Sequence, residues 1–155
     1  MGFLSFGVEE DDRLSALLAA AAPAATDSPV FAGSTSPRRQ RVALERAATC
    51  ARICDDNKGK EVLVLDTRAI TTEFDFLVIA TGNSRRQLHA MAEEIDSHME
   101  SEHEARLGIE GYETCKWIIQ DYGDIVVHLF DPFSRDFYRL EELWGQGKKI
   151  DWQRY

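Results

Sequence analysis

The apolar positions of the chain first repeat with a helical period. From Val42 to Cys54 they follow helical spacing, and residues 57–59 (Asn-Lys-Gly) provide a stop, so a helix is expected here. Helical spacing returns after Ser84, which forms a capping box with Gln87. The apolar stripe of this second helix consists of Leu88, Met91, Ala92, Ile95 and Met99. The pattern therefore predicts two long helices, each with one apolar face.

Short apolar runs between and after these helices predict four strands. Two of them, residues 61–66 and 74–81, precede the second helix, and the unbroken apolar centre of the latter indicates a strand that is buried on both faces. The other two, residues 116–121 and 124–130, are separated by a Tyr-Gly turn, which is typical of a hairpin. Ser134 is expected to cap a last short helix, with its buried side formed by Phe137, Leu140, Leu143 and Trp144.

The resulting order is α-β-β-α-β-β-α, which predicts a single α/β (α+β) domain over residues 38–144. The helix between the second and third strands favours a right-handed crossover, and the hairpin requires an antiparallel pair, so the sheet is expected to be mixed. Residues 1–37 hold three of the four prolines, an Ala cluster and an acidic run, and this composition predicts a disordered tail. Residues 145–155 are interpreted as a short C-terminal tail, in which Trp152 and Tyr155 either pack on the sheet or remain free.

Composition and charge narrow the classes of partner. The 155 residues are 44% hydrophobic and 29% charged, as in ordinary globular domains, and no apolar run approaches the roughly 20 residues of a membrane span. The net charge of −9 disfavours broad nucleic-acid binding, because phosphate contacts draw on clustered Lys and Arg. We therefore expect no membrane association and no DNA partner; an acidic chain suits a basic partner.

The cysteines and histidines do not predict a metal or cofactor site. The three cysteines include no CxxC pair, and Cys50 and Cys54 are interpreted as small core residues of the first helix. His98 and His103 are five residues apart, whereas a metal pair on one helical face would be four apart, so surface positions are expected. His128, within an apolar strand, is interpreted as structural.

One turn resembles part of an enzyme site. Residues 82–84 (Gly-Asn-Ser) join a strand to a helix, as in the opening of a nucleotidyltransferase, where such a turn holds a triphosphate. That chemistry needs two metals held by carboxylates at D-x-D spacing on a following strand, and no such pair follows. Nucleotide-binding and nucleophile motifs such as GxGxxG, GxxxxGK[ST] and GxSxG do not occur. The sequence therefore favours a non-enzymatic protein, with a nucleotide-binding or nucleotidyltransferase-like enzyme as the alternative.

Four blocks, in order, resemble a known family. They are FDFLVIATGNSRRQ (residues 74–87), GIEG (108–111), WIIQDYGDIVVHLF (117–130) and SRDFYRLEELW (134–144). Their order and spacing are similar to those of the ribosomal silencing factor family (RsfS, also called Iojap), over about residues 41–144. The resemblance implies a mixed-sheet fold with nucleotidyltransferase-like topology that lacks the catalytic carboxylates.

The resemblance also implies a function. Members of this family bind large-subunit ribosomal protein fourteen on the face that meets the small subunit, block the joining of the subunits and repress translation when nutrients are scarce. Free members are known as homodimers. A role in biogenesis of the large subunit shares the same partner, and the sequence does not separate the two roles. Relatives occur in bacteria, plastids and mitochondria, and the acidic N-terminal segment favours a bacterial cytoplasm.

Two aromatic residues are the leading candidates for the partner contact. Trp117 and Tyr138 match family positions that face the ribosomal partner, and Trp and Tyr are favoured at interface hot spots. Each also has a structural alternative, since Trp117 could be a core aromatic at a sheet edge and Tyr138 could join a core stripe. The neighbouring candidates are Ile118, Arg135, Arg139 and Leu140.

Overall fold

The structure, a computed structural model, describes residues 36–155. The tail predicted over residues 1–37 lies outside the described residues except for its last two, of which Pro37 begins a helix. In chain order the elements are α2 (Pro37–Asp56), β1 (Lys60–Asp66), β2 (Phe76–Thr81), α3 (Arg85–Ser101), β3 (Gly108–Glu110), β4 (Trp117–Asp121), β5 (Ile125–Phe130), α4 (Pro132–Tyr138), α5 (Leu140–Leu143), β6 (Lys148–Ile150) and η2 (Trp152–Arg154).

The strands form a six-stranded sheet in the order β3-β4-β5-β2-β1-β6. The central pair, β2 and β5, is parallel, and every other pair of neighbours is antiparallel. All residues of β2 and β5 are buried, as their unbroken apolar runs predict. The mixed-sheet α+β domain is thus confirmed, while its relation to nucleotidyltransferases stays a prediction.

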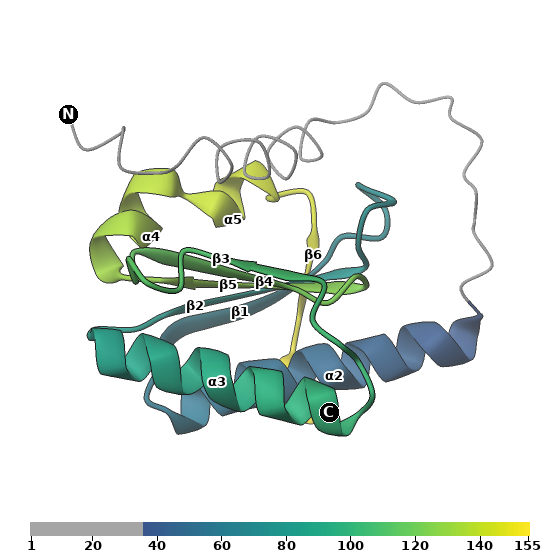
Figure 1. Cartoon of the computed structure of the whole chain (residues 1–155). Helices are drawn as coiled ribbons and strands as arrows, with labels where there is room; N and C mark the ends of the chain where they lie inside the picture. Colours follow the sequence, from purple (N-terminus) through teal and green to yellow (C-terminus); the bar gives the residue numbers. More distant parts are fainter. Residues whose placement is uncertain (1–35) are drawn as a thin grey trace.

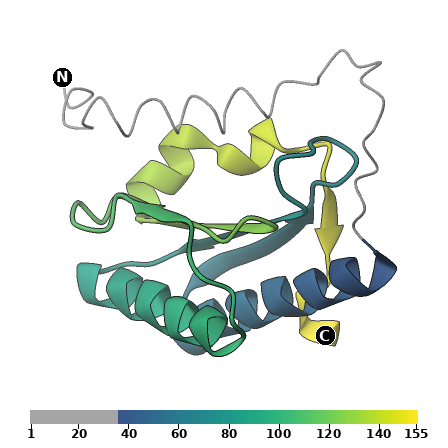
Figure 2. The ribbon, with the colours of Figure 1, turned by 45° about the vertical axis from the view of Figure 1, so that its right-hand side comes forward.

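Helices cover the two faces of the sheet in different ways (Figures 1 and 2). The long helices α2 and α3 lie side by side on one face, and the short helices α4 and α5 lie on the other. Because successive side chains of a strand point to opposite faces, each of the four central strands (β1, β2, β4 and β5) contributes to both of the resulting cores. On β4, for example, Ile118 packs under α2 and α3, whereas Trp117 and Ile119 belong to the core on the α4–α5 face.

The face of α2 that meets the sheet is built from small residues. Ala47, Cys50, Ala51 and Cys54 are fully buried, and their short side chains let the helix backbone lie near the strands. Burial raises the pKa of the Cys50 thiol to about 12, so this cysteine stays protonated and unreactive. The two cysteines of α2 therefore occupy the positions expected of small core residues.

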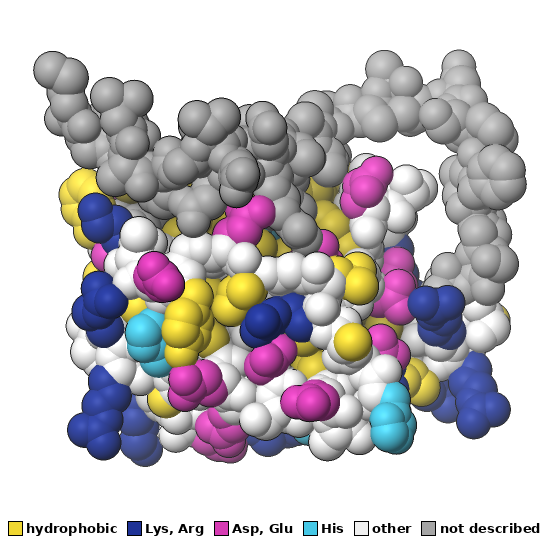
Figure 3. Space-filling view, in the orientation of Figure 1, with side chains coloured by type: hydrophobic (Ala, Val, Ile, Leu, Met, Phe, Trp, Pro, Cys, Tyr) yellow, Lys and Arg dark blue, Asp and Glu magenta, His cyan; other side chains and the backbone are white. Residues whose placement is uncertain are grey.

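The start of α3 is fixed by the capping box that the sequence predicts. The Ser84 hydroxyl accepts a hydrogen bond from the Gln87 N–H at 3.1 Å, and Gln87 Oε1 accepts one from the Asn83 N–H at 2.6 Å. The outer side of the helix is strongly acidic, and Figure 3 shows these carboxylates gathered on the face over α3. Helix α3 thus joins an apolar inner stripe to a charged, solvated surface.

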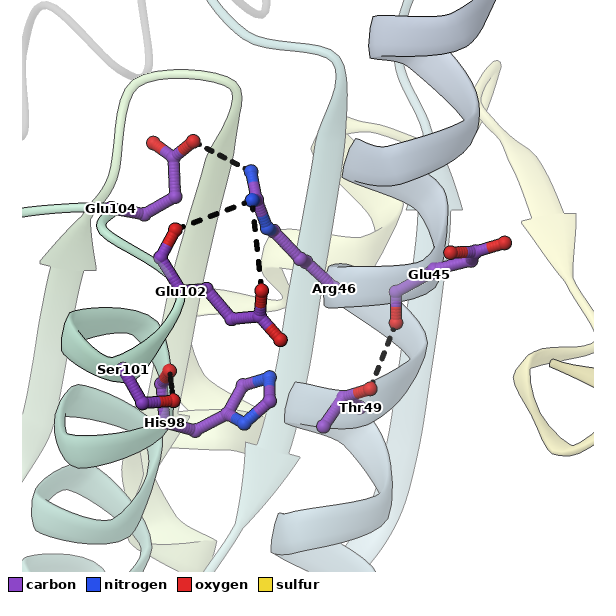
Figure 4. A network of polar contacts seen from close by, with 7 residues as sticks. All are labelled: Glu45, Arg46, Thr49, His98, Ser101, Glu102 and Glu104. Atoms are coloured by element: carbon purple, nitrogen blue, oxygen red, sulfur yellow. Dashed lines mark hydrogen bonds and ion pairs between the residues drawn. The ribbon is translucent and has the colours of Figure 1, made fainter.

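A polar network ties the end of α3 to the middle of α2 (Figure 4). The half-buried Arg46 guanidinium pairs with Glu104 at 2.6 Å and donates to the Glu102 carbonyl at 3.4 Å. The Ser101 hydroxyl donates to the His98 carbonyl at 2.6 Å. His103, exposed and with φ of 61°, lies at the turn that follows α3. These contacts fix the exit of the chain from α3, which then leads to β3.

The single helix predicted from Ser134 to Trp144 is wrong, because the chain breaks at Arg139 into α4 and α5. Arg139 has φ of 46°, in the left-handed region that ends a helix. The break rotates the two halves relative to one another, so Leu140 and Trp144 are buried as expected. Phe137 and Leu143, which were also expected in the core, are instead 51% and 49% exposed.

The structure contains two short strands that the predicted order α-β-β-α-β-β-α does not include. Residues 108–110, for which no strand is predicted from the sequence, form β3 and pair with β4 at one edge of the sheet. Residues 148–150, within the segment interpreted as a C-terminal tail, form β6 and pair with β1 at the other edge. Beyond β6, Trp152 packs against the core under α2, and the backbone carbonyl of Tyr155 accepts a hydrogen bond from Arg52.

Candidate partner-binding surface

Trp117 lies inside the α4–α5 face rather than on its surface. Its side chain is 3% exposed, and its ring centroid is 4.8 Å from that of Phe130 and 4.6 Å from that of Tyr138. Its Nε1–H donates a hydrogen bond of 2.9 Å to Nδ1 of His128. A buried indole with its N–H satisfied is a stable core element. In this conformation Trp117 supports Tyr138 from below.

His128 is the acceptor that fixes the orientation of Trp117. Complete burial lowers the pKa of His128 to about 3, so the imidazole is neutral at physiological pH. Because Nδ1 accepts the hydrogen bond from Trp117, the imidazole proton must lie on Nε2. This residue has the structural role that its apolar strand suggests, with Trp117 as the partner that sets its tautomer.

The outer part of this face carries exposed aromatic rings. Phe133 is 75% exposed, and its ring stacks on that of Phe137 with centroids 5.9 Å apart. Phe137 in turn meets the half-buried Tyr138 edge-on at 5.1 Å. We call Phe133, Phe137 and Tyr138 the aromatic surface. The hydrophobic pattern predicts Phe137 in the core and gives no role to Phe133; the i, i+4 spacing of the two phenylalanines is the sequence signal for their contact.

The two arginine candidates differ in accessibility. Arg135 is 6% exposed and links three elements, since it donates to Thr81 Oγ1 of β2 at 3.0 Å and pairs with Glu141 of α5 at 3.1 Å. Arg139, at the junction of α4 and α5, is exposed; its side chain donates to the Asp136 carbonyl at 3.3 Å and makes a loose ion pair with Glu142 at 3.7 Å. Arg135 therefore braces the short helices, while Arg139 presents its charge beside the aromatic surface.

The two aliphatic candidates are both core residues. Ile118 is fully buried on the opposite face of the sheet, under α2 and α3, and Leu140 is buried in the same core as Trp117. Of the six predicted contact residues, Tyr138 and Arg139 reach the surface. The other four, Trp117, Ile118, Arg135 and Leu140, lie behind it, and the partner role of all six stays a prediction.

The turn at residues 82–84 has a structural explanation. Its Ser84 hydroxyl and Asn83 N–H are both engaged in the capping box of α3. A Cβ atom at Gly82 would come within 2.8 Å of the Leu88 side chain, so close packing of the helix on the strand requires glycine here. Among the described residues, no group of three or more His, Cys, Asp or Glu side chains could hold a metal ion. The turn thus serves the packing of α3.

The fold and this surface define a mixed-sheet domain whose distinctive feature is an exposed aromatic surface with buried aromatic support. Residues 39–155 match the model of the family described as ribosomal silencing factor during starvation, RsfS. The match spans most of the chain, and the chain belongs to this family. It is a family of ribosome silencing factors and not a class of enzymes.

Named relatives and a solved structure agree with this assignment. The ribosomal silencing factor RsfS of Chromobacterium violaceum is 39% identical over 94 residues, which are 61% of this chain and 77% of the relative. A crystal structure of a protein from the same organism has a TM-score of 0.62 and 36% identity, covering 70% of this chain and 90% of that one. A protein of Mus musculus named mitochondrial assembly of ribosomal large subunit protein 1 is 37% identical over 89 residues, 56% of this chain and 39% of that one.

The relatives thus come from bacteria and from an organelle. Within residues 36–155, no helix has both the length and the apolar character needed to cross a membrane. The family assignment supports translation regulation and association with the ribosome as the role of this chain.

Proposed function

We propose that this protein binds ribosomal protein fourteen of the large subunit and, from that position, blocks joining of the small subunit, which represses translation when nutrients are limited. The family match over residues 39–155 carries the proposal. The aromatic surface supports it, because aromatic rings such as the exposed Phe133 and Phe137 and the half-buried Tyr138 are enriched at protein interfaces.

The proposed contact has a centre and a rim. Tyr138 and its neighbour Phe137 would form the centre, since their rings pack against each other and Tyr138 is supported from below by Trp117. Arg139 would form part of the polar rim. Trp117, Arg135 and Leu140 would then act indirectly, by holding the backbone of α4 and the ring of Tyr138 in place. Ile118, on the opposite face, would contribute through stability of the sheet.

Charge is compatible with this partner. The net charge of −9 repels nucleic acid at long range but attracts basic proteins, which are common at the ribosome surface. Binding should therefore weaken as the salt concentration rises. The part of the binding free energy that comes from the buried aromatic contact should not depend on salt.

Co-sedimentation with separated ribosomal subunits on sucrose gradients tests the proposal. We expect the wild-type chain to migrate with the large subunit and to reduce the yield of reassociated ribosomes. Tyr138→Ala should lose about 2 kcal/mol or more of binding free energy. Tyr155→Ala is the matched control, because this exposed tyrosine lies beyond η2 and is remote in sequence from α4. Normal binding by Tyr138→Ala would refute the site, and absence of wild-type binding would refute the function.

A second candidate, a factor for biogenesis of the large subunit, is favoured by the name of the mouse relative, which refers to assembly of the large ribosomal subunit. It shares the partner and differs in outcome. Binding to the large subunit without any loss of subunit association, together with accumulation of large-subunit precursors in a deletion strain, would favour this second role.

We also propose that the free protein is a homodimer in a bacterial cytoplasm, with a dimer surface that overlaps the aromatic surface. Burying Phe133 and Phe137 against a second copy would remove exposed apolar area from water. Phe137→Glu should then give a monomer by light scattering, whereas Tyr155→Ala should remain dimeric.

A further inference from the structure

A second site lies on the opposite face of the sheet from the aromatic surface. Between α3 and the β3–β4 pair there is a cavity of about 380 Å³, whose lining includes apolar and charged side chains. The apolar part comes from Ala92 and Ile109, the aromatic part from Tyr112, and the rim carries Glu93, Asp96 and Arg106. None of these residues takes part in the contact proposed for ribosomal protein fourteen, so the two sites are independent.

Gln120, one of the residues that line the cavity, carries a buried acceptor without a hydrogen bond. Gln120 extends from β4 toward α3 and is fully buried. Its Nε2 donates to the Ala92 carbonyl at 2.8 Å and to the Tyr122 hydroxyl at 3.2 Å, which fixes the orientation of the amide. Its Oε1 has no hydrogen-bond partner among the described residues. A buried acceptor of this kind favours a ligand that brings an N–H or O–H donor.

The charges around the cavity select a cation. Three carboxylates line it, those of Glu93, Asp96 and Glu113, against one guanidinium, that of Arg106. Arg106 is paired with Asp96 at 3.0 Å, which leaves the other two carboxylates in excess. This is also the face on which acidic side chains gather over α3 (Figure 3). The local potential is therefore negative and attracts positively charged groups.

The aromatic wall is held rigidly in place. The Tyr112 ring stacks on His89 with centroids 4.1 Å apart and an interplanar angle of 15°. The Tyr112 hydroxyl donates to Glu93 Oε1 at 2.6 Å. An aromatic ring next to a carboxylate, both fixed before any ligand arrives, is an arrangement that binds planar cations with little loss of conformational freedom.

We propose that this cavity binds a guanidinium group carried on a short aliphatic chain, whether a free alkylguanidine or an arginine side chain of a protein. The guanidinium has N–H donors in several directions, so it can supply Gln120 Oε1 and the rim carboxylates at once. It is planar and weakly hydrated, which suits an aromatic wall and an apolar lining. The methylene groups of the chain lie against Ile109 and Ala92.

Calorimetric titration of the full chain at low salt tests the proposal. The probes are agmatine, a capped Gly-Arg-Gly peptide whose arginine carries one positive charge, and tetramethylammonium, which matches the charge of that arginine but has no N–H donor. We expect saturable binding of guanidinium probes at one site and no binding of tetramethylammonium. Binding of agmatine alone indicates a free small molecule, tighter binding of the peptide indicates a protein side chain, and equal binding supports the shared chemistry.

Variants locate the site. Glu93→Gln and Gln120→Met should each weaken agmatine binding about tenfold or more. Glu93 is exposed, so its variant keeps the fold even if replacement of the buried Gln120 does not. Glu100→Gln, an exposed carboxylate of α3 outside the cavity lining, is the matched control and should bind normally. Absence of saturable binding below about 10 mM agmatine, equal binding of tetramethylammonium, or equal loss in all variants would overturn the proposal.

Discussion

On one face of the sheet, two long helices bury small side chains, and on the other, two short helices rest on large aromatic ones. Helix α2 contributes Ala47, Cys50 and Ala51 to a core in which the helix backbone lies near the strands. Helices α4 and α5 cover a core built around Trp117 and Trp144. The short helices are too small to cover every apolar ring on their side, and Phe133 and Phe137 remain exposed.

This difference indicates how stability and binding are divided in the molecule. The α2–α3 face closes the core with regular, periodic helices, which favours stability. The α4–α5 face holds exposed aromatic rings on a rigid base, which favours recognition, because the rings lose little freedom when a partner binds. Each face should therefore respond to a different kind of substitution.

Truncating the aromatic core should have the largest effect. Trp117→Ala removes the ring that packs on Phe130 and Tyr138 and leaves His128 Nδ1 without its donor. We expect a loss of about 4 kcal/mol in the free energy of unfolding, measured by urea denaturation. Trp117→Phe keeps most of the packing and should lose clearly less. Equal losses in the two variants would show that packing around this ring is unimportant.

Overfilling the small-residue core should come next. Ala51→Leu adds three carbons at a fully buried position of α2, on the side that packs against the sheet. The expected loss is about 2 to 3 kcal/mol, measured by the same denaturation. Glu45→Leu, on the exposed side of the same helix, should change stability by less than about 0.5 kcal/mol. A stable Ala51→Leu variant would contradict close packing on this face.

Acid should weaken the aromatic face through His128. Burial lowers the pKa of this histidine from 6.5 to about 3 in the folded protein, so the unfolded chain binds an extra proton between these values. The stability is fully present above pH 6.5 and is lost as the pH falls toward 3. Between pH 7 and pH 5 this contribution is about 2 kcal/mol.

His128→Gln isolates that contribution, because glutamine can still accept the Trp117 hydrogen bond but does not titrate. We expect the variant to lose less stability than the wild type when urea denaturation is repeated at pH 7 and pH 5. An identical pH dependence in both proteins would mean that His128 has the same pKa in the folded and unfolded states.

The smallest effect is expected at the junction of α4 and α5. Arg139 has φ of 46°, a conformation that glycine adopts without a steric penalty. Arg139→Gly should therefore raise the free energy of unfolding by up to about 1 kcal/mol, since the ion pair with Glu142 is exposed and contributes little. A lower melting temperature in calorimetry would indicate that the arginine side chain stabilises the junction more than its backbone strain costs.

The order of these four effects tests the comparison as a whole. If Ala51→Leu were the most damaging change and Trp117→Ala were mild, the α4–α5 face would not be a rigid base, and its aromatic surface would have to become ordered on binding.

The sequence by itself determined the helices and strands whose hydrophobic pattern extends over enough residues to be recognised without the tertiary structure. Helices α2 and α3, the strands β1, β2, β4 and β5, and the capping box at Ser84 all follow from periodicity or local chemistry. The ordered sequence blocks also identified the family, which the family model then matched. These features depend on residues close to one another in the chain.

Only the tertiary structure decided which candidate residues are accessible. Helix α4 is short, and the left-handed backbone of Arg139 changes the direction of the chain where α4 ends. The exposure of Phe137 and Leu143 could therefore not be predicted from their spacing in the sequence. Likewise, β6 forms because β1 offers it an open edge, a partner more than 80 residues away in the chain. Trp117 became a buried support for Tyr138 because α4 packs over it, and that contact exists only in the folded chain.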